Sequence, residues 1–234
     1  MEEVWADAGN IYVADSIGDL LYRFDDMTGA NLESYNGGGV PFADLRGVFV
    51  NGGFIYAATY SRVYRFTDMA GNGQVEFAGG GTPFWRANRL FIRGTGIYVA
   101  DFDSVTPDPR LYRFEDINGT NLQTFDDGGG AGPVFANVRD VVVDSAGRVY
   151  ALDLTNGEIY RFDDITGANQ QVYDGSAGTV FQTPRALAID SIDRIYVLDG
   201  GTQLLYRFDD ITGTNQVELS IGGTTSSDVF VVGP

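Results

Sequence analysis

Short apolar runs alternate with turns rich in glycine, aspartate and asparagine along the whole chain. In the first repeat of this pattern, the runs fall at about Glu3–Ala6, Ile11–Ala14, Leu20–Phe24 and Asn31–Tyr35. They are rich in Val, Ile, Tyr and Phe, which favour strands, whereas the residues between them favour turns. The pattern predicts four short strands, called A to D below, and an all-β fold.

This pattern of four strands occurs five times. Its most regular part is a Tyr-Arg-Phe tripeptide in strand C, whose tyrosines stand 42, 48, 48 and 46 residues apart, at Tyr22, Tyr64, Tyr112, Tyr160 and Tyr206. Four strands in a repeat of this length are typical of a β-propeller, in which four-stranded antiparallel blades surround a central channel. An open solenoid of four-stranded sheets is the alternative. We expect one β-propeller domain over residues 1–234, with repeats at about 1–44, 45–86, 87–136, 137–183 and 184–226.

The two ends of the chain both resemble an innermost strand. Five sets of strands B, C and D are accompanied by six A-type strands, because Asp228–Val232, in residues 227–234, has the same pattern as Glu3–Ala6. We therefore expect five blades, with six as the alternative, and one surplus A-type strand that is displaced or paired elsewhere. A strand with unpaired backbone groups invites pairing with another chain, so a monomer and a strand-exchanged oligomer are both open.

The fifth repeat carries a family resemblance. The pattern Phe181-x-x-Pro184-Arg185-Ala186-Leu187-Ala188-Ile189-Asp190, followed by Arg194–Asp199, resembles the NHL-type propeller repeat. The second strands Ile11–Asp15 and Ile97–Asp101 are the other close matches. The resemblance implies a propeller related in pattern to the gluconolactonase-like propellers, a family that usually has six blades.

Composition excludes several kinds of chemistry. The formal net charge is −17, which argues against a surface for nucleic acid or an anionic membrane. All 15 basic residues are arginine, and the chain has no lysine, histidine or cysteine. A Ser-His-Asp triad, a thiol nucleophile, a Schiff base, a P-loop, a disulfide and the usual zinc site are therefore excluded, as is the histidine-dependent lyase chemistry of related propellers. We assign no catalytic residue and expect no cofactor.

The acidic, lysine-free composition has two readings. It fits a salty or extracellular habitat, or the amplification of one lysine-free repeat. Leu20–Gly29 and Leu204–Gly213 are nearly identical, which fits a recently amplified or engineered repeat protein. No apolar stretch resembles a leader or a membrane span, so a soluble chain is expected, and an extracellular or periplasmic location with the leader removed stays open.

Four arginines are the main candidates for ligand binding. Each stands just ahead of a strand A, four residues after an aromatic (Phe42, Trp85, Phe135 or Phe181), and they are Arg46, Arg89, Arg139 and Arg185. In a closed ring they converge on one mouth of the channel. Guanidinium groups there would bind a small anion such as a carboxylate, phosphate or sulfate. The alternative is that each arginine pairs with a nearby carboxylate, such as Asp44 or Asp140, or with backbone carbonyls.

The other recurrent motifs are interpreted mainly as structure. The turn Asp25–Asn31 and its copies fit turn chemistry better than a calcium site. Aspartates that end strand B are expected to cap the following turn, namely Asp15, Asp101, Asp153 and Asp199. The strand C arginines are expected to bridge strands or blades. The long connection Phe102–Arg110 is either a specificity loop or drift.

Two classes of function remain from the sequence. The first is a non-enzymatic scaffold or binding module that holds a small anionic ligand or a protein at the channel mouth. The second is a metal-dependent hydrolase similar to the gluconolactonase-like propellers, with oxygen ligands drawn from Glu2 or Glu3, Asn88, Asp140 and Asp228. The spacing of these residues does not show that they converge.

Overall fold

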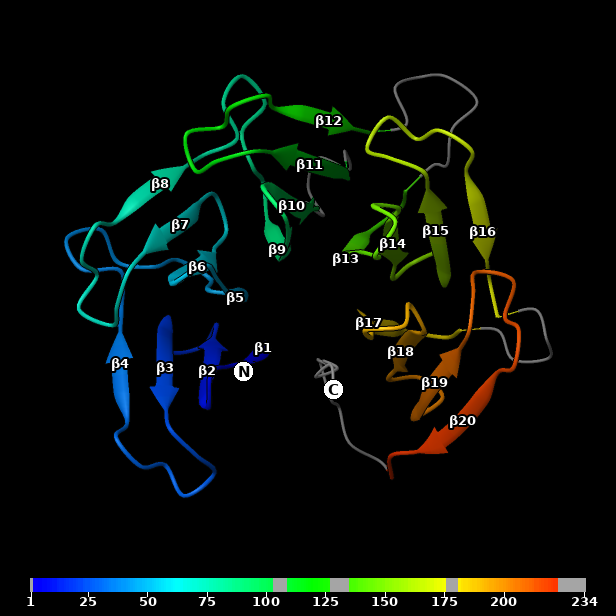
Figure 1. Cartoon of the computed structure of the whole chain (residues 1–234), viewed down its shortest axis with the longest axis horizontal. Coiled ribbons are helices and arrows are strands. Elements are labelled where there is room, and N and C mark those ends of the chain that lie inside the picture. The colour runs from blue at the N-terminus through cyan, green and yellow to red at the C-terminus, as the bar shows by residue number, and fades with distance from the viewer. Residues whose placement is uncertain (1, 103–108, 127–134, 176–180, 223–234) are drawn as a thin grey trace.

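The computed structural model describes residues 2–102, 109–126, 135–175 and 181–222, and every regular element in these ranges is a β-strand. The strands form five separate four-stranded antiparallel sheets, each built from consecutive strands. The sheets stand as blades around a central axis (Figure 1). The protein is a five-bladed β-propeller, which confirms the predicted architecture.

The blade boundaries follow the repeats. Blade 1 consists of β1 (Glu3–Asp7), β2 (Asn10–Asp15), β3 (Leu20–Phe24) and β4 (Glu33–Tyr35). Blade 2 consists of β5 (Gly47–Asn51), β6 (Phe54–Ala58), β7 (Val63–Phe66) and β8 (Val75–Phe77). Blade 3 consists of β9 (Ala87–Arg93), β10 (Gly96–Asp101), β11 (Arg110–Phe114) and β12 (Gln123–Phe125). Blade 4 consists of β13 (Val138–Val143), β14 (Val149–Asp153), β15 (Glu158–Phe162) and β16 (Gln171–Tyr173). Blade 5 consists of β17 (Pro184–Ile189), β18 (Ile195–Asp199), β19 (Leu204–Phe208) and β20 (Val217–Ser220).

The fourth strand of blade 1 is shorter than predicted. In blade 1 the prediction started at Asn31, but β4 starts at Glu33. Asn31 has a φ of 53° and donates from Nδ2 to Asp25 Oδ2 at 2.7 Å, so it closes the turn instead of entering the strand. Asparagine tolerates this left-handed conformation because its side chain bonds locally.

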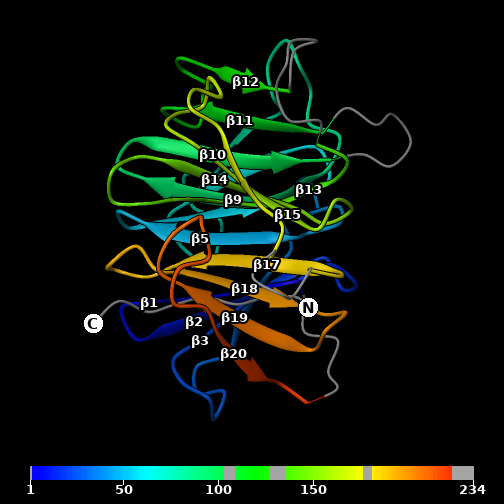
Figure 2. The same ribbon diagram turned by 90° about the vertical axis from the view of Figure 1, so that its right-hand side faces the viewer.

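The meander order gives the propeller two different faces. The A–B and C–D turns lie on one face, here called the turn face, and the B–C turns and D–A loops lie on the other, here called the mouth face. Figure 2 shows strands such as β17 and β18 running from one face to the other. The inner strands therefore all begin at the mouth face, where the candidate arginines stand.

Aromatic quartets fill four junctions between blades. Each quartet takes one ring from the outer strand of a blade, one from the following loop, and two from the third strand of the next blade, with neighbouring rings at tilted or edge-on angles. The quartets are Tyr35, Phe42, Tyr64 and Phe66; Phe77, Phe84, Tyr112 and Phe114; Phe125, Phe135, Tyr160 and Phe162; and Tyr173, Phe181, Tyr206 and Phe208. The tyrosine and phenylalanine of the recurrent Tyr-Arg-Phe motif are thus part of the hydrophobic core in blades 2 to 5.

The arginine of that motif lies on the other face of the sheet. Arg161 on β15 is paired with Tyr150 on β14 and donates to Gln171 Oε1 on β16 at 2.6 Å. Arg113 makes the same bridge to Gln123 in blade 3. These contacts support the predicted structural role of the strand C arginines.

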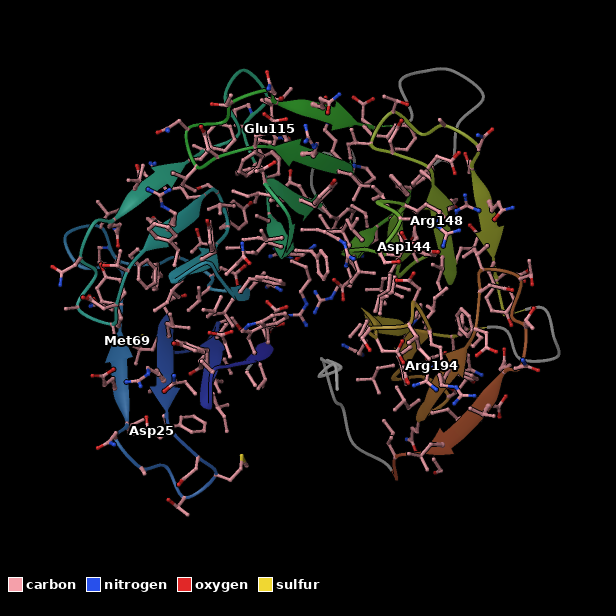
Figure 3. The ribbon with its side chains drawn as sticks, viewed as in Figure 1. Asp25, Met69, Glu115, Asp144, Arg148 and Arg194 are labelled. Carbon is pink, nitrogen blue, oxygen red and sulfur yellow. The ribbon has the colours of Figure 1, made fainter. Side chains whose placement is uncertain are left out.

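Blades 4 and 5 each have the same contact of an aspartate with an arginine and a tyrosine at the turn face. Asp144 lies beside Arg148 (Figure 3), accepts from Arg148 Nε at 2.5 Å, and also accepts from the Tyr150 hydroxyl at 3.1 Å. Asp190 repeats these bonds in blade 5, with Arg194 Nε at 2.6 Å. Burial raises the pKa of Asp190, but hydrogen bonds led by that of Arg194 outweigh it and leave the pKa below its usual range. These contacts fix the two turns.

Two predicted features lie outside the described residues, namely most of the connection Phe102–Arg110 and the surplus strand Asp228–Val232. No helix in the described ranges is long and apolar enough to cross a membrane.

Candidate functional site: the channel mouth

Buried aspartates at the ends of the second strands organise the mouth face. Asp153 is completely buried and accepts from the backbone of Ala136 at 2.6 Å and of Thr155 at 2.9 Å. Asp199 repeats this with Gln182 and Gly201. The predicted cap of the B–C turn is confirmed for both. The hydrogen bonds from Ala136 and Gln182, in the loops that lead into the inner strands, were not predicted. The sequence alone does not show which distant amide donates to a carboxylate.

Beta-bulges place two of the candidate arginines. Val138 pairs with Asp153 and Asp140 pairs with Leu152, so Arg139 is the extra residue between them. Arg185 holds the same place in β17, between Pro184 and Ala186. A bulge re-aims the side chain of its extra residue relative to the regular strand.

Blade 3 departs from this register by one residue. Its loop aromatic in the core is Phe84, whereas Trp85 is 42% exposed. The residue at the bulge is consequently Asn88, and Arg89 follows it inside the regular strand. From the sequence, Trp85 was grouped with the other loop aromatics because it stands four residues before Arg89. This was wrong, since the adjacent Phe84 is the ring that enters the core.

Glu2 lies between two of the arginines. Its Oε2 atom accepts from Arg139 Nη2 at 3.3 Å and lies 3.8 Å from Arg46 Nη1. Its other carboxylate oxygen accepts from the Ser16 hydroxyl at 3.0 Å. Glu2 precedes β1, Arg46 precedes β5, and Arg139 lies on β13, so three blades supply this contact. Arg46 and Arg139 therefore bind a carboxylate that belongs to the protein's own chain.

Arg89 lies beneath this contact. Its side chain is 2% exposed, donates from Nη1 to the Arg46 carbonyl at 3.2 Å, and lies 3.6 Å from Glu3 Oε2. The same oxygen of Glu3 accepts from the Val48 amide at 2.6 Å. Arg89 thus joins the inner strands of blades 1, 2 and 3.

Local pairing also occurs at the mouth, as the alternative interpretation predicted. Arg46 Nε donates to Asp44 Oδ2 at 2.8 Å, and Arg86 lies 3.5 Å from the same oxygen. Arg185 stands apart, because within the described ranges it shares no carboxylate with the other three arginines, and its side chain lies over the backbone of Gly200. The structure brings together three of the four predicted arginines, here called the mouth cluster (Arg46, Arg89 and Arg139).

The electrostatics of the mouth cluster depend on the acidic residues that lie beside the arginines. Burial lowers the pKa of the Arg139 guanidinium, the cation of Arg89 lowers it further, and the carboxylate of Glu2 opposes both. Three guanidinium groups face Glu2, Glu3 and Asp44 at salt-bridge distance. Glu2 thus offsets part of the positive charge on Arg46 and Arg139, and replacing it by a neutral residue removes that contribution.

The oxygen ligands expected for a metal are used in other ways. Asp140 accepts from the Leu187 amide at 2.9 Å and from its neighbour Val141 at 2.8 Å. Asn88 Nδ2 donates to the Val138 carbonyl at 3.5 Å. Over the described part of the chain, no three acidic residues gather as a metal site would require.

The repeated C–D turns show turn chemistry. Asp26 accepts from the Thr28 backbone at 2.8 Å, and Gly29 has a φ of 77°, which glycine adopts without strain. Hydrogen bonds from Thr28 hold the pKa of Asp26 below its usual range. Asp164 and Thr166 repeat the backbone bond in blade 4.

Comparison with known proteins identifies the fold. No family model and no curated protein matches the sequence. Among solved structures, a streptogramin B lyase is similar at a TM-score of 0.71 and 12% identity, over 99% of this chain and 72% of that one. Virginiamycin B lyase from Staphylococcus aureus gives 0.72 and 11%, over 99% and 73%. Its catalytically inactive histidine-to-alanine form with quinupristin gives 0.70 and 10%, over 98% and 73%.

The likeness establishes a propeller and nothing finer. At 10% to 12% identity it does not single out NHL-type or gluconolactonase-like propellers, and it carries no activity to this chain. This chain has no histidine, whereas the inactive neighbour differs from its active form by one histidine. What the mouth cluster binds must therefore be argued from its own geometry.

Proposed function

We propose that this protein is a non-enzymatic binding module that holds a ligand carboxylate at the mouth cluster. The observation that carries the proposal is the clamp on Glu2, whose carboxylate contacts Arg46 and Arg139 from two different blades. Glu2 marks the place where a ligand carboxylate binds. The ligand takes the place of Glu2 when it enters.

The cluster is suited to this role because its cations are held in advance. Arg46 is oriented by Asp44 and Arg139 by the bulge in β13, so neither guanidinium has to be ordered when a ligand arrives. A planar guanidinium donates two parallel hydrogen bonds to a carboxylate, which a compact ammonium group cannot do. Among the described residues, the buried Nε atom of Arg139 has no hydrogen-bond partner, so a donor of the cluster is available.

Arg89 acts as a positioning residue in this proposal. Its guanidinium donates to the Arg46 backbone and lies against Glu3, so it fixes β5 and β1 relative to each other. Arg185 lies at the bulge of β17, outside the mouth cluster, and its buried Nε atom has no partner among the described residues. It supplies a second contact for a ligand with two carboxylates.

The test is calorimetric titration with succinate and with inorganic sulfate. In the double variant Arg46→Ala/Arg139→Ala, we expect succinate binding to be lost while the chain stays folded. The matched control is Arg113→Ala/Arg161→Ala, which removes the same charge from the outer bridges and is expected to bind like the wild type. Equal affinity in both double variants would overturn the proposal, as would a wild-type chain that binds neither anion.

A further inference from the structure

A small cavity lies between blades 3 and 4 at the turn face. Its wall on blade 3 is formed by Tyr98, Arg113 and Gln123, which stand opposite one another on β10, β11 and β12 and therefore project from the same face of the sheet. Its wall on blade 4 is the C–D turn with Asp164 and Ile165. The cavity has a volume of about 300 Å³, at the lower limit for small-molecule pockets, so it has room for one small ligand.

Two further junctions repeat this cavity. Its volume is about 260 Å³ between blades 1 and 2, and about 210 Å³ between blades 4 and 5. Each is lined by the strand C arginine, by the residue paired with that arginine on the outer strand, and by an apolar residue of the next C–D turn. These are Arg23, Glu33 and Met69 in the first, and Arg161, Gln171 and Ile211 in the second. The three cavities, built in the same way, are here called the turn-face pockets.

The junction between blades 2 and 3 differs from the other three. The residue paired with Arg65 on the outer strand is Val75, and the Arg65 guanidinium lies over the Phe54 ring, 4.5 Å from its centroid. In blade 3 the place of Phe54 is held by Gly96, where an added Cβ would lie 2.7 Å from the Tyr98 ring. At the junction between blades 2 and 3, apolar side chains thus stand where the other three junctions have polar or small residues.

The pocket between blades 3 and 4 offers a donor on one wall and an acceptor on the other. Arg113 Nη1 donates to Gln123 Oε1 at 3.3 Å, so within the described ranges the NH2 group of Gln123 is left as a donor. Asp164 accepts two bonds of its own turn through Oδ1, which leaves Oδ2 as an acceptor. Gln171 and Asp210 repeat this arrangement between blades 4 and 5. A hydroxyl group suits both walls, because it can donate and accept.

The charges that line the pockets favour a neutral ligand. Between blades 3 and 4, Arg113 and Asp164 balance one another. Three carboxylates accompany Arg23 between blades 1 and 2, and three accompany Arg148 and Arg161 between blades 4 and 5. An anion is therefore repelled by the surplus of negative charge in two pockets, and a cation finds no such surplus in the third.

We propose that the turn-face pockets are binding sites for a neutral sugar, each of which takes one sugar ring. The hydroxyl groups at the rim of the ring bond to the outer-strand side chain and to the carboxylate of the turn. The C–H groups on its face cover the apolar floor formed by Met69, Ile165 or Ile211, which are at most 8% exposed. These sites lie on the opposite face from the mouth cluster and do not depend on the proposed carboxylate binding.

Methyl NMR of the full-length chain tests each pocket separately. The probes are methyl α-glucoside, methyl α-galactoside and methyl α-mannoside, and at least one of them is expected to shift the methyl signals of Met69, Ile165 and Ile211 in a saturable way. Ile117 stands at the equivalent place between blades 2 and 3 and is the internal reference, whose signals should stay in place. Equal shifts at Ile117, or no saturable shift with any of the three sugars, would overturn the proposal.

A single substitution gives one pocket the apolar residue of the junction between blades 2 and 3. Gln123→Val places in blade 3 the side chain that Val75 has in blade 2, and valine favours a strand, so the chain is expected to stay folded. Sugar binding at Ile165 should weaken about tenfold, while the shifts at Met69 and Ile211 are kept. Loss of binding at all three pockets, or at none, would contradict the proposal.

The double variant Arg46→Ala/Arg139→Ala separates the turn-face pockets from the mouth cluster. It removes two cations of the mouth and should leave the sugar-induced shifts at Met69, Ile165 and Ile211 unchanged. Their loss in this variant, or the same shifts on addition of succinate to the wild type, would contradict a neutral sugar site at the turn face. A wild-type chain that fails to bind succinate while the sugar shifts appear would overturn the carboxylate site alone.

Discussion

The two faces of the propeller differ in how strictly the repeats agree. On the turn face, the bond between the turn asparagine and the carboxylate six residues before it recurs in four blades, to Asp25, Glu115, Asp163 and Asp209. On the mouth face, the position equivalent to Glu2 is occupied by Arg46, Asn88, Arg139 and Arg185 in successive blades. The difference teaches that recurrent residues here build the fold, whereas the divergent position is where a specific ligand can be recognised.

The largest effect is expected from a recurrent aromatic near the mouth. Phe135→Ala removes a ring that packs edge-on against Phe125 and Tyr160 and leaves a cavity between blades 3 and 4. We expect a loss of about 3–5 kcal/mol in the free energy of unfolding, measured by urea denaturation. A loss below about 1 kcal/mol would show that the quartets do not hold the blades together.

The next prediction tests whether a residue at the mouth face contributes to stability or to ligand binding when it recurs in other blades. Asp153 lies at the mouth face but has an equivalent in Asp199, and both are fully buried. Asp153→Ala leaves the amides of Ala136 and Thr155 without their acceptor, and we expect a loss of about 2–3 kcal/mol. If the variant lost succinate binding without losing stability, the claim that recurrent residues stabilise the fold while divergent residues bind the ligand would be wrong.

Substitutions at two glycines of blade 4 distinguish the cost of backbone strain from the cost of a steric clash. Gly147 and Gly167 have φ values of 86° and 81°, but an added Cβ meets nothing within 4 Å at Gly147 and meets the Phe125 ring at Gly167. Gly147→Ala should cost about 1 kcal/mol for the left-handed conformation, and Gly167→Ala should cost more. Equal urea midpoints for the two variants would contradict the tight contact between the turn and the preceding blade.

Acid should weaken the turn face once the carboxylates of its turns are protonated. Hydrogen bonds led by those of Thr28, Asn72, Thr120 and Asn169 hold the pKa values of Asp26, Asp68, Asp116 and Asp163 below the usual 3.8. A lowered folded-state pKa stabilises the protein above the unfolded-state value, and this contribution is lost as the pH falls through the lowered pKa. The urea midpoint should therefore hold down to about pH 4.5 and fall below it. A fall that starts near pH 6 would contradict this.

The smallest effect on stability is expected at the mouth cluster itself. Arg46→Ala removes ion pairs of partly exposed side chains with Asp44 and Glu2, and such pairs contribute about 0–1 kcal/mol. The urea midpoint should scarcely move, while succinate binding weakens. A large loss of stability would make Arg46 part of the fold and remove it from the proposed site.

The fold could be predicted from the sequence, because the repeat places a tyrosine in each third strand every 42 to 48 residues. Four of these side chains are buried against the preceding blade, namely those of Tyr64, Tyr112, Tyr160 and Tyr206. The site could be read only in part. Arg46 and Arg139 were predicted at the mouth, but the register of Arg89 depends on which of Phe84 and Trp85 enters the core. Their partner Glu2 was named from the sequence only as a candidate metal ligand, since a contact between residues 137 positions apart has no local signal.

The claim that Glu2 occupies a carboxylate site is tested most directly by calorimetric titration of Glu2→Gln with succinate. The variant keeps the size of the side chain and removes the competing negative charge, so we predict that succinate binds about tenfold more tightly than to the wild type, a difference of about 1.4 kcal/mol. Unchanged or weaker binding by the folded variant would contradict the account.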